Sequence, residues 1–157
     1  MDKVRVGLIG AGGISRAHIP GYLACRDRAE VVAIADPVEE AARRAREALG
    51  GGEVYADWRA LLERADVDAV DVCLPHDLHA PVAVAAAELG KHILVEKPIA
   101  RDLAEADAMI GAADRAGVRL MVCHDRRYHP AFAKIKELVD SGAIGKPLCL
   151  RLDHNQY

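Results

Sequence analysis

The stretch KVRVGLIGAGGIS, residues 3–15, decides the fold of this chain. Its apolar, β-branched first half predicts a strand over 3–9, and a helix is expected over 14–25. A glycine-rich turn between a strand and a helix lets backbone N–H groups and the positive end of the helix dipole approach a phosphate closely. We therefore predict that this turn cradles the pyrophosphate of a dinucleotide through Gly10, Gly12, Gly13 and Ile14.

An acidic residue supports this interpretation. The next predicted strand, 30–35, is followed by Asp36, where a carboxylate accepts hydrogen bonds from the ribose hydroxyls of adenosine. A carboxylate there repels a 2′-phosphate, so the pattern favours NAD over NADP. Arg43 and Arg44 are close in sequence, but we interpret them as solvated residues of a surface helix. The alternative is an ordinary tight turn beside a solvated aspartate.

The order of the elements predicts the fold class. Short β-branched runs alternate with alanine-rich stretches of helical period, which indicates right-handed βαβ units and a parallel sheet covered by helices on both faces. We therefore predict an α/β protein with a doubly wound parallel sheet, a Rossmann domain, over residues 1–123. Further strands are expected over 53–55, 68–74, 92–95 and 118–123, and further helices over 38–49, 57–64, 78–89 and 102–116.

Two helix starts carry capping signals. Asp57 is expected to cap the helix that follows it, and Asp102 with Glu105 resembles a capping box. The helix after Asp102 has apolar residues at helical spacing, which we expect to face the core. These residues are Leu103, Ala106, Met109, Ile110 and Ala113.

Composition excludes several classes of protein. The chain is 52% apolar and 29% charged, with a formal net charge of −3, which gives no electrostatic reason to expect nucleic acid or an anionic membrane as a partner. No apolar run approaches the roughly 20 residues of a membrane span, and no secretory leader is evident. We therefore expect a cytoplasmic protein. Its four cysteines, which are widely spaced, are expected to be reduced thiols, most of them in the core.

A second motif follows the strand predicted over 92–95. Glu96-Lys97-Pro98 lies at the carboxyl end of that strand, the edge where ligands bind in open α/β sheets. An ammonium held beside a glutamate can donate to a substrate oxygen and steady the charge that develops during hydride transfer. The proline makes a cis peptide bond possible. From the residues alone, a surface ion pair between Glu96 and Lys97 stays an open alternative.

Five motifs in this order resemble the N-terminal half of the glucose-fructose oxidoreductase, inositol dehydrogenase and MocA family. They are the glycine loop, Ala35-Asp36-Pro37, the segment from Leu74 to His79, Glu96-Lys97-Pro98, and the segment from Arg126 to Pro130. The Glu-Lys-Pro turn is the most specific of them. Pro75, His79, Arg127 and Pro130 match the family pattern, whereas Leu74, His76 and Asp125 replace residues that are usual there.

The resemblance implies an NAD(P)-dependent oxidoreductase that acts on a sugar, a polyol or a related hydroxyl compound. It implies that Lys97 lies between nicotinamide and substrate as the catalytic residue. It also implies that a second half of the protein supplies the acid/base pair. Residues near the coenzyme would include Pro75, His79, Glu96, Lys97 and Arg127. The alternative is a non-catalytic NAD(H)-binding module or partner subunit.

The tail differs from the rest of the chain. Residues 129–140 have the pattern of an amphipathic helix, and an apolar strand is expected from Leu148 to Leu152. We interpret 124–157 as a connecting helix and the first strand of a truncated α+β domain for substrate binding and dimerisation. A strand needs an adjacent edge, so we expect Leu148 to Leu152 to pair with a second copy in a homo-oligomer or to pack back on the domain.

Other candidate sites are weaker. His76 and His79 could be imagined as metal ligands, with Cys123 and His124 as further candidates. The two histidines alone supply only two ligands, so no metal is expected. His18 and His129 are interpreted as surface or helix-contact residues. Cys73 has no neighbouring base in the sequence and is not expected to be a nucleophile.

Overall fold

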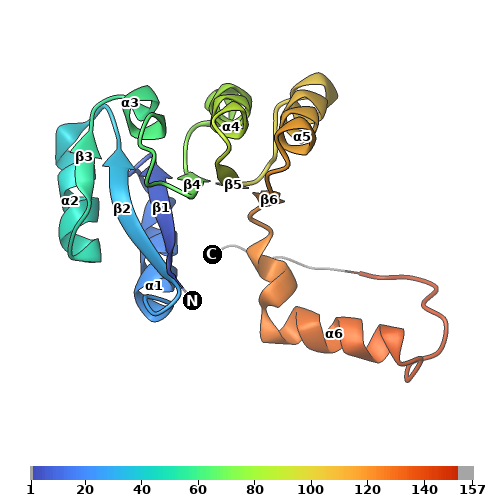
Figure 1. Cartoon of the computed structure of the whole chain (residues 1–157). Coiled ribbons are helices and arrows are strands. Elements are labelled where there is room, and N and C mark those ends of the chain that lie inside the picture. Colours follow the sequence, from blue (N-terminus) through green and yellow to red (C-terminus); the bar gives the residue numbers. More distant parts are fainter. Residues whose placement is uncertain (1, 152–157) are drawn as a thin grey trace. The chain divides into compact units, whose positions relative to one another are not determined.

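The computed structural model describes residues 2–151. The chain divides into two compact units, residues 1–123 and residues 124–157. The first unit contains a six-stranded sheet (Figure 1) with the strand order β3-β2-β1-β4-β5-β6. The strands are β1 (Val4–Ile9), β2 (Ala29–Ala35), β3 (Glu53–Tyr55), β4 (Ala69–Val72), β5 (His92–Val95) and β6 (Leu120–Val122).

Every strand pairing in this sheet is parallel. The strand order is that of the doubly wound dinucleotide-binding fold, which confirms the predicted fold class. The last residues of five strands also lie in one row, because Ala35, Ile9, Val72, Val95 and Val122 are register partners in that sequence across the sheet. The residues that follow them therefore emerge at one edge, which we call the carboxyl edge. They are Asp36, Gly10, Cys73, Glu96 and Cys123.

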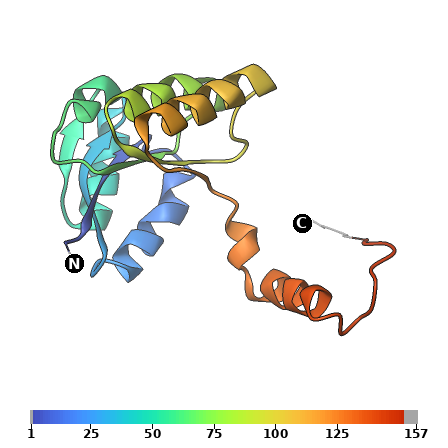
Figure 2. The same cartoon turned by 45° about the vertical axis from the view of Figure 1, so that its right-hand side comes forward.

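Helices cover the sheet on two sides. In Figure 2, α4 and α5 lie above the sheet and α1 lies below it. One apolar core lies under α1 and α2, and a second lies under α3, α4 and α5. Short 3-10 turns, η1 and η2, precede two of the helices. The helical segments are α1 (Ser15–Ala24), α2 (Glu39–Leu49), α3 (Trp58–Leu62), η1 (His76–Leu78), α4 (His79–Glu88), α5 (Leu103–Ala116), η2 (Asp125–Tyr128) and α6 (Pro130–Asp140).

The predicted caps are present. Asp57 accepts a hydrogen bond from the backbone N–H of Arg59 at 2.9 Å, and Asp102 accepts one from Glu105 at 2.9 Å. The capping box is incomplete, because the Glu105 carboxylate accepts from the backbone N–H of Arg101 instead of Asp102. Local rules thus located both helix starts.

The predicted inner face of α5 is partly wrong. Met109 and Ala113 are buried, but Leu103 is 83% exposed and Ile110 is 46% exposed. The buried side of α5 consists of Met109, Ala112 and Ala113, and it meets an α4 rich in buried alanine. Small side chains let two helices approach closely, so the contact follows the alanines and leaves the larger side chains outside.

The second unit consists of η2, α6 and irregular chain, and none of its described residues is buried. Phe132, Leu138 and Val139 are half-buried on one side of α6, whereas Ile135 is 47% exposed. The predicted strand from Leu148 is not formed over the described residues 148–151, and Leu150 is 74% exposed. No strand of this unit within those limits offers an edge to pair with, which is the physical reason. Leu152 lies outside the described residues.

Among residues 2–151, no helix combines the length and the apolarity that a membrane crossing requires.

Candidate functional site

The glycine loop begins at the carboxyl edge with a position that only glycine can fill. Gly10 has φ +93°, and a Cβ there would lie 2.4 Å from the backbone oxygen of Cys73. Its N–H donates to the Ala35 carbonyl at 2.8 Å. The tight turn predicted at Gly10 is therefore imposed by the approach of β4 and β2 to the end of β1.

The next two glycines have open space around them. A Cβ on Gly12 or Gly13 would meet no protein atom within 4 Å. Ser15 is fully buried, and its hydroxyl donates to the Gly12 carbonyl at 2.7 Å, which holds the loop against α1. No side chain caps the start of α1 at Ile14, and its first turn contains no acid. Uncapped N–H groups facing an open loop fit an anionic pyrophosphate.

Asp36 lies directly beside this loop. Its Oδ2 accepts a hydrogen bond from the Ala11 N–H at 2.7 Å, and its Oδ1 accepts one from Val38 at 2.8 Å. The predicted acid and the predicted loop are thus one site at the ends of β1 and β2. Arg43 and Arg44 are exposed on the outer side of α2 and bond to Glu40, which agrees with their interpretation as solvated residues of a surface helix.

The Glu-Lys-Pro turn follows β5 at the same edge. Glu96 is 7% exposed, and its N–H donates to the Val72 carbonyl at 3.1 Å. The Lys97 N–H donates to Glu96 Oε2 at 3.1 Å, and Lys97 Nζ lies 3.9 Å from that oxygen. The Lys97 side chain is 58% exposed, and the Lys97–Pro98 peptide bond is cis. Glu96 and Lys97 thus form an ion pair with one buried and one exposed partner, which differs from a pair of two solvated side chains.

His79 contacts this turn from the start of α4. It is fully buried at the start of α4, and its two ring nitrogens lie 2.9 Å from the Pro98 carbonyl oxygen and 3.0 Å from that of Leu74. Pro75, which is exposed, precedes η1 beside it. The imidazole therefore ties the end of β4 to the Glu-Lys-Pro turn, so its geometry is that of a support for the site.

His18 is the residue that sequence reasoning missed. It was interpreted as a surface or helix-contact residue, yet its side chain is only 10% exposed and contacts residues at the ends of two strands. His18 Nδ1 lies 2.8 Å from Asp71 Oδ2, and Nε2 lies 3.0 Å from Glu96 Oε1. The Tyr22 hydroxyl also donates to Asp71 Oδ2, at 2.9 Å. The signal was Asp71 itself, a charge inside the apolar strand β4, because buried charges are almost always paired.

The charges of this cluster stabilise one another. The hydrogen bond to Asp71 outweighs burial and, together with Glu96, raises the pKa of His18 to about 9. Burial acts to raise the pKa of Glu96, but hydrogen bonds from His18, Cys123 and the Lys97 N–H leave that pKa below its ordinary value. At neutral pH an imidazolium thus lies between two carboxylates.

The cysteines are only partly as expected. All four lie in the described part of the chain and form no disulfide, but only Cys73 is buried, and Cys149 is exposed. Cys73 Sγ lies 3.6 Å from His18 Nδ1, an ionisable neighbour that the sequence did not reveal. Burial nevertheless raises the pKa of the Cys73 thiol well above its ordinary value, which keeps it protonated and unreactive.

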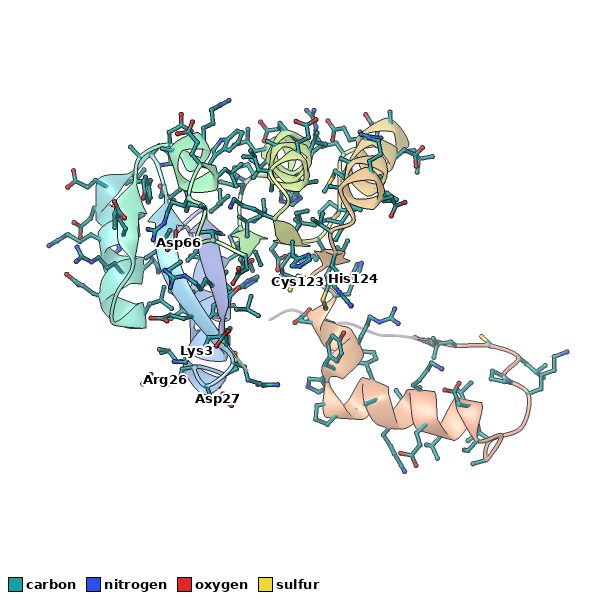
Figure 3. All side chains as sticks on the ribbon, in the orientation of Figure 1. Lys3, Arg26, Asp27, Asp66, Cys123 and His124 are labelled. Carbon is teal, nitrogen blue, oxygen red and sulfur yellow. The ribbon has the colours of Figure 1, made fainter. Side chains whose placement is uncertain are left out.

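The remaining predicted site residue belongs to the second unit. Arg127 lies in η2 and is exposed, and with Arg126, Phe132 and Lys136 it lines an open hollow of about 360 Å³. Figure 3 labels Cys123 and His124 where the chain leaves β6. The structure thus brings together the glycine loop, Asp36 and the Glu-Lys-Pro turn within the first unit.

Comparison with known proteins identifies the family of this chain. A family model described as an oxidoreductase family with an NAD-binding Rossmann fold matches residues 4–124. Levoglucosan dehydrogenase of Pseudarthrobacter phenanthrenivorans is 38% identical and aligns over 96% of this chain and 40% of its own length. Myo-inositol 2-dehydrogenase of Thermotoga maritima is 39% identical over 95% of this chain and 44% of its own length.

Solved structures are equally similar. Levoglucosan dehydrogenase in complex with NADH and levoglucosan has a TM-score of 0.86 and 36% identity, over 92% of this chain and 41% of that one. The WlbA dehydrogenase of Bordetella pertussis, in complex with NADH and UDP-GlcNAcA, has a TM-score of 0.86 and 34% identity, over 92% and 44%. The chain spans less than half the length of these relatives. It belongs to the oxidoreductase family with an NAD-binding Rossmann fold, the family that its five motifs resemble.

Proposed function

We propose that this chain is the NAD(H)-binding portion of a dehydrogenase that acts on a sugar, a polyol or a related hydroxyl compound. One observation carries the proposal. At the carboxyl edge, the open glycine loop, the uncapped start of α1 and the carboxylate of Asp36 form a single surface. Together these groups match the pyrophosphate and the adenosine ribose of a dinucleotide.

The side chains favour NAD over NADP. Asp36 presents a carboxylate where a 2′-phosphate would have to lie, and the two nearby guanidinium groups of Arg43 and Arg44 are bonded to Glu40. The relatives solved with a coenzyme that we compared contain NADH. A putative NADPH-dependent oxidoreductase from Desulfitobacterium hafniense also has this fold, at 30% identity, so the choice rests on the local charges.

Lys97 is the residue that we place at the reacting oxygen. Its ammonium is exposed at the carboxyl edge, whereas the neighbouring Glu96 carboxylate is buried and orients it. In this proposal the ammonium donates a hydrogen bond to the substrate oxygen and stabilises its negative charge as the C–H bond breaks. A bound nicotinamide would supply the hydride acceptor or donor for this reaction.

We assign residues 1–123 to coenzyme binding and residues 124–157 to the start of a domain for substrate binding and dimerisation. The site near Lys97 contains no paired His and Asp beyond the buried His18 cluster, within the described residues of the first unit. An acid/base pair from a second half, as the resemblance implies, would complete the chemistry. Arg127 and the residues that select the substrate would belong to that second half.

Titration of the chain with NADH tests the proposal, with nicotinamide fluorescence as the signal. Gly12→Val should weaken binding by about tenfold or more, because the new side chain fills the volume meant for phosphate. Gly21→Val is the matched control in the same region, since a Cβ there also meets no protein atom within 4 Å. Equal binding by Gly12→Val and the unchanged chain, with both folded, would contradict a phosphate site at the loop.

The non-catalytic NAD(H)-binding module would satisfy the same titration, and only a substrate-dependent assay separates the two functions. A cytoplasmic location and a homo-oligomer stay predictions from the sequence. Light scattering of the chain tests self-association, which the missing strand at Leu148 no longer supports.

A further inference from the structure

One side chain connects the coenzyme loop to the Glu-Lys-Pro turn. His18 lies on α1, the helix that begins at the glycine loop. Its ring reaches across the sheet edge to Asp71 on β4 and to Glu96 after β5, two strands that lie side by side in Figure 1. Three segments that are far apart in the sequence thus meet at a single imidazole.

The Glu96 carboxylate contacts both His18 and Lys97. Its Oε1 is bonded to His18, and its Oε2 accepts the Lys97 N–H at 3.1 Å and lies 3.9 Å from Lys97 Nζ. The two oxygens of one carboxylate therefore hold two different partners. A rotation of the Glu96 carboxylate away from His18 would also withdraw the acceptor from Lys97.

The ionisable groups around His18 either stabilise the imidazolium or are themselves neutral. Asp71 on β4 is fully buried, and Glu96 is buried beside it. Tyr22 on α1 and Cys73 after β4 have pKa values raised by burial, so they face His18 as a neutral hydroxyl and a neutral thiol. Cys123, after β6, contributes a thiol hydrogen bond to Glu96. A neutral His18 would leave the buried Asp71 carboxylate without a cation, and it would leave Glu96 with only the exposed Lys97 ammonium at 3.9 Å.

A metal ion would compete with bonds that already exist. The cluster contains two three-residue groups whose ligand atoms lie within 4.8 Å of one another, one with Asp71 and Cys73 and one with Glu96 and Cys123. Both groups use His18, and each of its ring nitrogens is already bonded to a carboxylate oxygen. Hydrogen bonds therefore account for the arrangement.

We propose that His18 is a positioning residue for Lys97: as a cation between Asp71 and Glu96, it keeps the Glu96 carboxylate ionised and turned towards Lys97. Helix α1 and Lys97 are thereby joined through one series of ion-paired side chains, Asp71–His18–Glu96–Lys97. This inference rests on the proposed role of Lys97, and it adds a residue outside the motifs that led to that role.

Carbon-detected NMR of the whole chain tests the inference, with signals from the Glu96 carboxyl carbon and from Lys97 Cε. In the unchanged chain we expect the Glu96 carboxyl to titrate below the ordinary pKa of glutamate, 4.5, and to shift again near pH 9 as His18 loses its proton. In His18→Gln the upper step should vanish. Burial without the cation should then raise the Glu96 pKa above 4.5, and Lys97 Cε should shift with the same midpoint.

Tyr22→Phe is the matched control, because it removes a hydrogen bond to Asp71 without touching Glu96. It should leave the Glu96 titration unchanged, whereas a general loosening of the cluster would alter it. Should His18→Gln fail to fold, Asp71→Asn keeps the imidazole and should lower the midpoint of the upper step from about pH 9. A Glu96 titration that is the same in His18→Gln and in the unchanged chain would overturn the inference.

NADH added to the same samples keeps the two proposals distinguishable. Shifts of Gly12, Gly13 and Asp36 on addition of NADH test the coenzyme site, and they do not depend on His18. If those shifts are absent but Glu96 titrates as expected, the proposed function is refuted and the inference about His18 still stands.

Discussion

The two units of the chain differ in how much of themselves they bury. The first unit has two apolar cores on opposite faces of its sheet, and side chains such as Leu8, Ile34 and Val95 are fully buried. The second unit has no buried residue among its described ones, and its exposed apolar side chains include Ile144 and Leu148. A short segment cannot bury enough apolar surface to offset the entropy of ordering it.

This difference decides where a site can be precise. Gly10, Asp36, His79 and Glu96 are fixed by backbone contacts or by burial in the first unit, so the coenzyme site rests on rigid elements. Arg127 has no comparable support from buried neighbours within the described second unit. Coenzyme binding is therefore expected to be a property of the first unit alone.

The largest expected effect comes from removing buried volume. Leu8→Ala should lower the free energy of unfolding by about 2–5 kcal/mol, because Leu8 is fully buried under α1 and α2. Ile135→Ala, a matched change on α6 where the side chain is 47% exposed, should change it by less than about 0.5 kcal/mol. Urea unfolding followed by circular dichroism measures both, and equal effects would contradict the contrast between the units.

A smaller effect is expected from pH. His18 has a folded pKa raised from 6.5 to about 9, so its contribution to stability is fully present below pH 6.5 and is lost as pH rises through 9. The unfolding free energy of the first unit should therefore fall by about 1–3 kcal/mol from pH 6.5 to above pH 9. Urea unfolding at both pH values provides the measurement.

The buried thiol needs a control in this experiment. Burial raises the pKa of Cys73, which also lowers stability above pH 9, so the series should be repeated in Cys73→Ala. Asp71→Asn removes the largest cause of the His18 shift and should flatten the profile below pH 9. A profile that keeps its slope in Asp71→Asn would show that another group causes it.

Local chemistry explains what the sequence predicted well. The glycine loop, Asp36 and the cap at Asp57 each depend on residues that are close in sequence or on the ends of neighbouring strands, and all lie where they were expected. The alternation of strands and helices likewise predicted the parallel sheet, because βαβ units leave few arrangements open.

The wrong predictions share one physical origin: each concerns a residue whose structure depends on partners far away in the sequence. His18 meets residues 53 and 78 positions away, and nothing near it in the sequence indicates those contacts. Leu103 was placed in the core because helical spacing shows a stripe but not which neighbour packs on it. The strand from Leu148 was predicted from apolar residues alone, although a strand also requires an edge.

The most direct test of the central claim is an NADH titration of residues 1–123 beside the whole chain. The claim is that the first unit contains the complete coenzyme site. We predict that the shortened chain folds and binds NADH with a Kd within about twofold of that of the whole chain. A folded first unit that has lost NADH binding, while the whole chain keeps it, would contradict the account.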